Sequence, residues 1–220
     1  MSDKERAHYI IDQMTPEQVS SFIVLFGYID SPVPNSETLE ADSFKEAKDW
    51  GLAKVYATRG EMNGSSGKYI KTAKSIKIIA FGMKSWRDAK SNDVKALLQR
   101  GGSIKIITMD PDCPNLKARE RDEHDNTIGN SIRDLVKWAE RLNSESASGK
   151  IEIRMHDHLP LDFLFLMNNR LFTGPYEYGK SSQQTVSFEY EITGDAYEYY
   201  EEFFDRLWEN PEFCKDAMEN

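Results

Sequence analysis

The sequence predicts an α/β domain in which a mostly parallel central sheet is flanked by helices. Two short apolar runs, residues 76–82 and 104–109, have the length and β-branched composition of buried strands. A helical segment over residues 93–100, closed by Gly101-Gly102, separates them, and such a crossover joins neighbouring parallel strands in the right-handed sense. We therefore expect a βαβ unit with functional groups at the carboxyl ends of its strands.

The beginning of the chain predicts a helical hairpin over residues 1–29. Apolar residues recur at helical spacing in two stretches, and Thr15, Pro16 and Gln18 have the pattern of a capped helix start. Because a pair this small cannot bury its own apolar face, it must pack on the main domain, on another copy or on a different protein. We expect a homo-oligomer, such as a homodimer, formed through the hairpin. Residues 30–42 have the composition of an extended linker.

The α/β domain is expected over residues 43–212, followed by a tail over residues 213–220. It opens with a short helix, capped by Ser43 and Glu46 and ending at Gly51, and with a short strand over residues 52–56. The run from Gly64 to Gly67 predicts a surface loop.

The second half of the domain predicts more helices and strands. Residues 127–142 repeat apolar side chains at helical spacing, and apolar runs at 151–155, 163–167 and 186–190 predict strands, with a turn at Asn168-Asn169. The last helix starts at Gly194-Asp195. Its aromatic stripe should close the core and its acidic residues should face solvent; the stripe is Tyr197, Tyr200, Phe203, Phe204, Leu207 and Trp208.

Composition narrows the class of protein. A chain of 220 residues with 39% hydrophobic and 30% charged residues is expected to fold into a soluble domain. Its apolar runs are too short to cross a bilayer and its first residues lack a secretory signal, so the expected location is cytoplasmic. Neither cysteine has metal-ligand spacing, and we predict no metal and no cofactor. The net charge of -9 opposes general nucleic-acid binding.

Polar residues after the second buried strand are candidates for ligand binding. Asp110 and Asp112 follow that strand, where they could bind a ligand or cap a turn. Arg119 could clamp a phosphate or carboxylate, but acidic neighbours make an ion pair a close alternative.

Two later segments complete the set of candidates. His156, with Asp157 beside it, is the best candidate for proton transfer, although structural or ligand-positioning roles are favoured over catalysis. Tyr176, Tyr178 and Gly179 suggest a loop that approaches a ligand closely, or an ordinary glycine turn.

The order of these segments resembles a divergent branch of the phospholipase D-like (PLD-like) superfamily, an uncharacterised domain found behind bacterial helix-turn-helix regulators and in other bacterial signalling proteins. The resemblance covers roughly residues 44–210. It implies a PLD-like sandwich and maps ligand-binding positions to Asp110, Asp112, Arg119, His156, Asp157, Tyr178 and Gly179.

The chain departs from the catalytic motif of that superfamily, His-any-Lys-any four-Asp, whose histidine attacks phosphorus. If Asn168 takes the place of the aspartate, the His and Lys positions fall on Leu161 and Phe163. If Asn169 does, they fall on Asp162 and Leu164. Neither frame keeps the nucleophile, so the standard phosphodiesterase mechanism is not expected.

Three functional hypotheses follow. The first is a catalytically inactive PLD-like module that senses a small phosphorylated or nucleotide-like ligand or acts as a regulatory scaffold. The second is a phosphodiesterase, nuclease-like or other nucleotide-processing enzyme that uses His156. The third is an interaction protein with an empty cleft.

Overall fold

The computed structural model describes residues 45–159 and 162–218. The chain divides into two units, Met1–Lys45 and Glu46–Asn220, and the second contains nearly all the described residues. The predicted hairpin, residues 1–29, and the predicted linker, residues 30–42, lie outside the described residues. Residues 45–49 are helical, which agrees with the short helix expected before Gly51.

Eight strands form one sheet in the order β1-β7-β6-β5-β2-β3-β4-β8. In chain order the strands are β1 (Leu52–Tyr56), β2 (Ser75–Ile79), β3 (Ser103–Met109), β4 (Lys150–His156), β5 (Asp162–Met167), β6 (Arg170–Pro175), β7 (Ser187–Glu191) and β8 (Lys215–Asp216). The helices among them are α4 (Arg59–Ile70), α5 (Lys84–Gln99), α6 (Pro114–Asp122), α7 (Ile128–Glu145) and α8 (Asp195–Trp208), and a 3-10 turn covers Ser182–Gln184.

The expected mixture of helices and strands is confirmed, but the expectation of a mostly parallel sheet is wrong. The predicted βαβ unit is present, because β2 pairs in parallel with β3, and β3 with β4. The other five neighbouring pairs are antiparallel. After β4 the chain returns through a β5–β6 hairpin turned at Asn168-Asn169, and β6 was not predicted. The apolar period of a strand is the same in both orientations, so it could not indicate this change of direction.

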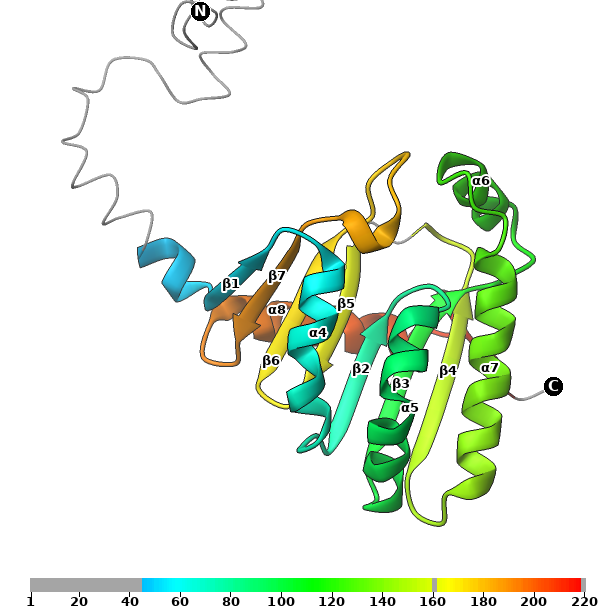
Figure 1. Ribbon diagram of the computed structural model, residues 1–220, viewed down its shortest axis with the longest axis horizontal. Helices are drawn as coiled ribbons and strands as arrows, with labels where there is room; N and C mark the ends of the chain where they lie inside the picture. The colour runs from blue at the N-terminus through cyan, green and yellow to red at the C-terminus, as the bar shows by residue number, and fades with distance from the viewer. Residues whose placement is uncertain (1–44, 160–161, 219–220) are drawn as a thin grey trace, which may run out of the picture. The chain divides into compact units, whose positions relative to one another are not determined.

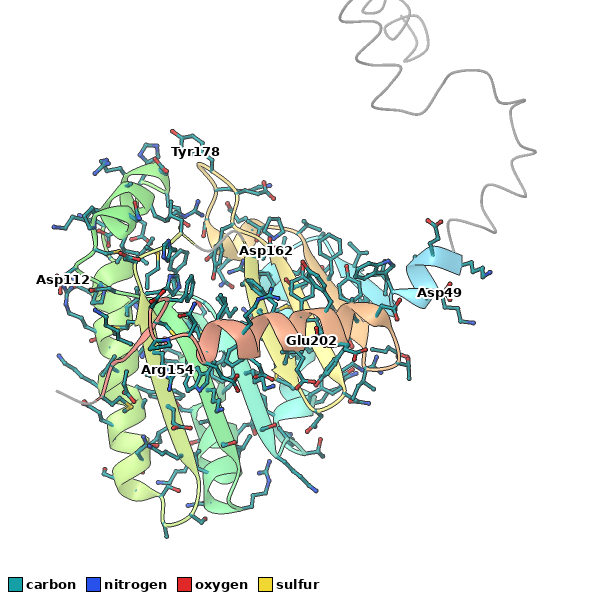
Figure 2. All side chains as sticks on the ribbon, turned by 180° about the vertical axis from the view of Figure 1, so that it is seen from behind. Asp49, Asp112, Arg154, Asp162, Tyr178 and Glu202 are labelled. Carbon is teal, nitrogen blue, oxygen red and sulfur yellow. The ribbon has the colours of Figure 1, made fainter. Side chains whose placement is uncertain are left out.

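Helices cover the sheet on both faces (Figure 1). Helices α4, α5 and α7 lie on one face, and α8 lies on the other, as the reverse view shows (Figure 2). Alternate residues of each strand enter the two cores: Ile76 and Ile78 pack toward the three helices, whereas Ile79 packs toward α8. The predicted aromatic helix is confirmed as α8, with Phe204 and Trp208 buried.

Helix α4 replaces a predicted loop. The segment from Gly64 to Gly67 lies inside this helix, so the loop prediction is wrong. Thr58 caps the helix by accepting a hydrogen bond from the Glu61 backbone N–H at 3.2 Å, and burial of Met62 and Ile70 against the sheet outweighs the poor helix propensity of glycine and serine.

Lys215 and Asp216, near the end of the described residues, are part of the sheet. Residues 213–220 were expected as a tail, but Lys215 and Asp216 pair with β4, and Cys214 is buried. Within residues 45–159 and 162–218, no helix combines the length and the hydropathy needed to cross a membrane.

Candidate functional site

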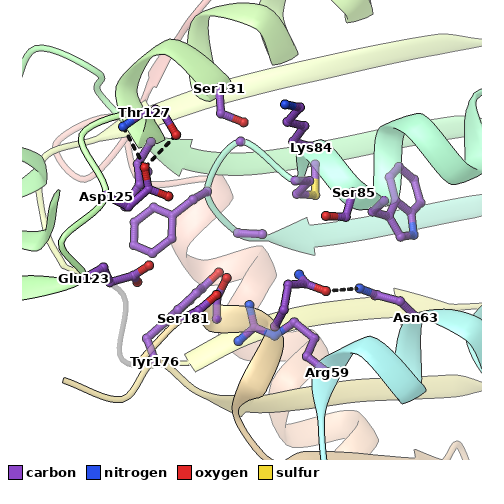
Figure 3. A pocket seen from close by; sticks show the side chains of 18 of the residues that line it. Arg59, Asn63, Lys84, Ser85, Glu123, Asp125, Thr127, Ser131, Tyr176 and Ser181 are labelled. Carbon is purple, nitrogen blue, oxygen red and sulfur yellow. Dashed lines mark hydrogen bonds between the residues drawn. The ribbon is translucent and has the colours of Figure 1, made fainter. Parts of the chain in front are cut away.

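A cavity of about 250 Å³ lies at the carboxyl end of β2, on the face covered by α4, α5 and α7 (Figure 3). We call it the polar cavity. Three elements supply most of its charged and polar side chains: α4, the start of α5, and the α6–α7 connection. Its charged and polar lining residues are Arg59, Asn63, Lys84, Ser85, Glu123, Asp125, Thr127, Ser131, Tyr176, Ser181, Ser182 and Gln183.

The loop that joins β2 to α5 forms the floor of the polar cavity. Gly82 passes so close to α7 that a Cβ atom there would lie 2.4 Å from the carbonyl carbon of Ser131. Met83 follows with a left-handed backbone, φ 50°, and no side chain caps α5. Buried Arg87 fixes the loop by donating to the carbonyl of Gly82 at 2.8 Å and to that of Ser131 at 3.2 Å. The N-terminus of α5 is thereby held at the cavity wall with its first backbone N–H groups available to an anion.

Arg59, the first residue of α4, is the principal cation of the polar cavity. It is only 6% exposed, and its guanidinium lies 3.7 Å from the ring centre of Phe163 and 4.6 Å from that of Tyr176. No carboxylate oxygen of the described residues lies within 4.0 Å of its nitrogens. Burial lowers the pKa of Arg59, but a guanidinium stays protonated at neutral pH.

Tyr176 and Glu123 partly oppose the lowering of the Arg59 pKa, but the hydrogen bonds of Arg59 within the protein are weak. Its Nη2 donates to the Pro175 carbonyl at 3.5 Å and to Thr185 Oγ1 at 3.4 Å, both longer than an ordinary N–H···O bond. Its Nε has no partner, and the indole Nε1 of Trp86, which also lines the cavity, has none. Buried donors without partners cost free energy, and a ligand oxygen would recover it.

The opposite wall of the polar cavity is acidic. Figure 3 shows Glu123 and Asp125 across from Lys84, Ser85 and Arg59. Burial raises the pKa of Glu123 while its ion pair with Arg119 opposes that rise. Asp125 accepts from the Thr127 backbone N–H at 2.9 Å and from its hydroxyl at 2.6 Å. The cavity is therefore polarised, with cations and helix N–H groups on one side and carboxylates on the other.

Of the predicted site residues, Asp110 and Asp112 lie on an exposed turn after β3. The Asp110 carboxylate accepts from the Asp112 backbone N–H at 2.8 Å, and its own backbone N–H donates to the His156 carbonyl at 2.7 Å. The Asp112 carboxylate pairs with Arg133 at 2.6 Å on the surface. Neither aspartate lines the polar cavity.

Arg119 does not line the polar cavity, but it contacts residues that form its wall. It is 7% exposed, is paired with Glu123, and donates from Nη2 to the Glu177 carbonyl at 3.1 Å. It thereby fixes the segment that carries Tyr176 into the cavity. Tyr178, only two residues along, is 81% exposed (Figure 2). Gly179 has φ 66° and nothing within 4 Å of an added Cβ atom.

His156 lies on the other face of the sheet. It lines a second cavity with α8 and Phe213, while Asp157 is exposed and near His158, 3.4 Å between Oδ1 and Nε2. Burial lowers the pKa of His156 to about 4, so the imidazole is neutral at pH 7. The predicted residues therefore do not share one cavity: Arg119 contacts Glu123 in the wall of the polar cavity, and His156 lines the second cavity.

Apart from Tyr176, the residues that line the polar cavity were not singled out in the sequence. Arg59 and Lys84 belong to no recognised motif, and both positions depend on how the chain folds back onto β2. One local signal was available: Thr58-Arg59-Gly60-Glu61 fits the capping-box pattern and would have placed Arg59 at a helix start. No group of three or more histidine, cysteine or acidic side chains able to hold a metal ion occurs among the described residues.

Comparison with known proteins gives weak likenesses. No protein-family model and no curated protein matches the chain. TrmBL2, an archaeal chromatin protein, is similar with a TM-score of 0.47 and 15% identity, over 79% of this chain and 58% of its own. NucT from Helicobacter pylori is similar with a TM-score of 0.46 and 11% identity, over 74% of this chain and 97% of its own.

A third similar structure is phosphatidylserine synthase from Haemophilus influenzae Rd KW20, with a TM-score of 0.46 and 12% identity, over 71% of this chain and 37% of its own. The chain thus spans less than two thirds of two of these three proteins. Likenesses of this size assign neither a family nor an activity. The expectation against general nucleic-acid binding is corrected to this extent: the structure of TrmBL2 is described as showing a novel mode of DNA binding, so the net charge of -9 alone does not exclude a nucleic-acid partner.

Proposed function

We propose that this chain is a divergent PLD-like domain that binds a small phosphorylated, nucleotide-like ligand in the polar cavity and senses it without hydrolysing it. The observation that carries the proposal is Arg59, a buried guanidinium at the cavity wall with no carboxylate partner among the described residues. Taking such a cation out of water is costly, and an anionic ligand would compensate for that cost.

The surroundings of Arg59 favour a phosphate over a carboxylate. A phosphate offers several oxygens, and the polar cavity supplies donors from several directions: Arg59, Lys84, Ser85 and the uncapped start of α5. A helix N-terminus with an arginine nearby is a common environment for phosphoryl oxygens.

The acidic wall restricts the chemistry of the part of the ligand that lies away from the phosphate. Glu123 and Asp125 would repel a second phosphate, but they accept hydrogen bonds from hydroxyl or amino groups. A monophosphate with a sugar or a base attached fits this polarity: the phosphate lies toward Arg59 and the hydroxyl or amino groups lie toward Glu123.

Binding without turnover is supported by the composition of the cavity. Its described lining contains no histidine and no cysteine, and in the frame where Asn168 replaces the motif's aspartate, Phe163 stands at the lysine position. The guanidinium of Arg59 lies over that phenylalanine ring. In that frame, the guanidinium of Arg59 would lie close to the position of the motif's lysine. No residue in the described cavity lining would replace the motif's nucleophilic histidine. His156, the basis of the rival enzyme hypothesis, lines the other cavity.

Calorimetric titration tests the proposal with matched pairs of compounds: AMP against adenosine, and ribose 5-phosphate against ribose. A short single-stranded DNA is included because nucleic acid is not excluded. The phosphorylated member of a pair should bind at least tenfold more tightly, since a hydrogen bond to a charged group contributes about 1.5–3 kcal/mol. Phosphorus NMR should show the ligand intact. Equal binding of both members, or no binding by any phosphorylated compound, would contradict the proposal.

Arg59→Met separates binding from folding. The unbranched methionine keeps the contact with Phe163 and Tyr176 but removes the charge, so phosphate-dependent binding should be lost. The free energy of unfolding without ligand should stay the same or rise, because no buried cation remains to be desolvated. Arg100→Gln is the matched control: Arg100 donates to the carbonyls of Ile70 and Ala73, away from the cavity, and its loss should leave binding unchanged.

A further inference from the structure

A second cavity, of about 330 Å³, lies on the α8 face of the sheet, beyond the carboxyl ends of β2, β3 and β4. We call it the apolar cavity. Most of its wall is aliphatic or aromatic: Ile79, Ile107, Leu159, Leu164, Tyr199, Tyr200, Phe203, Leu207 and Phe213. Its volume lies within the range of about 300–1,000 Å³ that is usual for small-molecule sites. It shares no lining residue with the polar cavity.

The rim of the apolar cavity exposes hydrophobic surface. Leu159 is 45% exposed and Tyr199 is 58% exposed, and both line the cavity. Inside, the ring of Phe213 lies nearly parallel to those of His156 and His158, with interplanar angles of 23° and 8° and centroids about 5 Å away. Flat, parallel rings provide a wall on which another flat ring can pack by offset stacking.

His156 supplies a hydrogen-bond donor without a partner. Its side chain belongs to a residue only 5% exposed, and its Nδ1 accepts from the His158 backbone N–H at 3.1 Å. A neutral imidazole whose Nδ1 accepts carries its proton on Nε2. No hydrogen bond joins that Nε2–H to another described residue, and the atom is not among the fully buried polar atoms that lack a partner, so solvent or a ligand reaches it. A ligand in this cavity would gain by placing an acceptor opposite it.

Asp162 supplies the complementary acceptor. It opens β5, lines the cavity, and has no cationic group within 4.0 Å among the described residues. Burial raises the pKa of its carboxyl group. The residue is exposed at the start of β5, so a donor on the ligand would replace water at this carboxylate, and an anionic ligand would be repelled by it.

We propose that the apolar cavity binds a small, uncharged, flat heteroaromatic ring that accepts a hydrogen bond from Nε2 of His156 and donates one to Asp162. The aliphatic and aromatic walls exclude a strongly hydrated group. A quaternary ammonium ion would suit the aromatic side chains, but it has no acceptor for the His156 N–H. The site is independent of the phosphate-binding function proposed above.

Titration with adenine and nicotinamide tests the proposal, because both are flat and neutral and carry an acceptor and an N–H donor. Tetramethylammonium is the comparison probe. Each heterocycle should bind wild-type protein, and Leu207→Trp, which fills the cavity from α8, should abolish that binding. His156→Phe keeps the ring but removes the donor and should weaken binding about fivefold. Arg59→Met, in the other cavity, should leave binding of nicotinamide unchanged.

Three results would overturn the inference. They are failure of both heterocycles to bind, equal binding to wild type and to Leu207→Trp, and preference for tetramethylammonium. Because the added tryptophan could prevent folding, a second measurement uses the wild-type protein: bound nicotinamide should shift the NMR signals of the His156 imidazole, and unchanged signals contradict the site. Loss of AMP binding in Arg59→Met with nicotinamide binding retained separates this site from the phosphate site.

Discussion

The polar and apolar cavities lie on opposite faces of one sheet and differ in nearly every chemical respect. The polar cavity has two cations, two carboxylates and the uncapped start of α5. The apolar cavity has aliphatic and aromatic walls, two imidazoles, of which that of His156 is neutral at pH 7, and one carboxylate. Both are lined by residues at or just beyond the carboxyl end of β2, so the contrast arises from which face of the sheet each side chain occupies.

Side-chain alternation explains the separation. In β5, Phe163 and Phe165 face α4, α5 and α7, whereas Leu164 between them faces α8. His156 faces the α8 side, and Arg59 arrives from a helix on the other side. His156 and Arg59 therefore cannot act together on one ligand. The face of the sheet on which a side chain lies therefore decides which cavity it lines and which ligand it can contact.

The largest effect on folding stability is expected from a substitution in the β2–α5 loop, which forms the floor of the polar cavity. Gly82→Ala places a Cβ atom 2.4 Å from the Ser131 carbonyl carbon in α7, so the β2–α5 loop must move. We expect a loss of about 3 kcal/mol in the free energy of unfolding, since overpacking of this kind typically costs 1–3 kcal/mol and backbone yields less than a side chain. Chemical denaturation measures the loss, and AMP binding should disappear with it.

Gly64→Ala is the matched control for that substitution. Gly64 lies on the exposed side of α4 and nothing lies within 4 Å of an added Cβ. Alanine should therefore stabilise the protein by about 0.5–1 kcal/mol through helix propensity. If both substitutions had the same effect, the close approach of Gly82 to α7 would not matter.

The apolar cavity predicts a pH dependence of stability. The pKa of His156 is lowered from 6.5 to about 4 in the folded protein, mainly by burial. Below pH 6.5 the unfolded chain takes up a proton that the folded chain refuses, so stability is fully present above that pH and is lost as the pH falls toward 4. The full shift in the pKa of His156 corresponds to at most about 3 kcal/mol of stability. Because the imidazole lines a cavity that solvent can enter, we expect a loss of about 2 kcal/mol.

Denaturation of wild type and His156→Phe at pH 7 and pH 4 isolates this contribution, because other titrating groups are common to both proteins. The wild type should lose about 2 kcal/mol more than the variant between these pH values. His158, whose side chain is 61% exposed, serves as the control: His158→Gln should keep most of the wild-type dependence. Parallel pH profiles for wild type and His156→Phe would show that the imidazole is not buried as described.

The parts of the fold that sequence could predict are those with a local signal. Apolar runs located β2, β3 and β4, and helical spacing located α7 and α8. Strand direction has no local signal, so the antiparallel β1, β5, β6 and β7 were not foreseen as such. Helix α4 was hidden because Gly64 and Gly67 indicate a loop, and only packing against the sheet makes them helical.

The candidate site was less accessible to sequence than the fold. Asp110 and His156 were placed correctly near strand ends, but the strand pattern did not show which face His156 would take. Arg59 was missed because its importance comes from burial without a carboxylate partner, and neither property can be read before the chain is folded. Arg119 forms an ion pair with Glu123, which was the alternative to ligand binding, and also donates to the Glu177 carbonyl. Its role as a phosphate or carboxylate clamp stays a prediction.

The turn after β3 lies outside the lining of both cavities. Substitutions there should therefore have the smallest effects on folding stability and on ligand affinity. Asp110→Ala removes the acceptor for the Asp112 backbone N–H and should cost about 1 kcal/mol, as loss of a local cap does. Asp112→Asn removes only an exposed ion pair with Arg133 and should cost less than about 0.5 kcal/mol. Neither should change the affinity for AMP or nicotinamide. A tenfold loss of either ligand in Asp112→Asn would mean that this turn reaches a binding site, and the division into two cavities would then be incomplete.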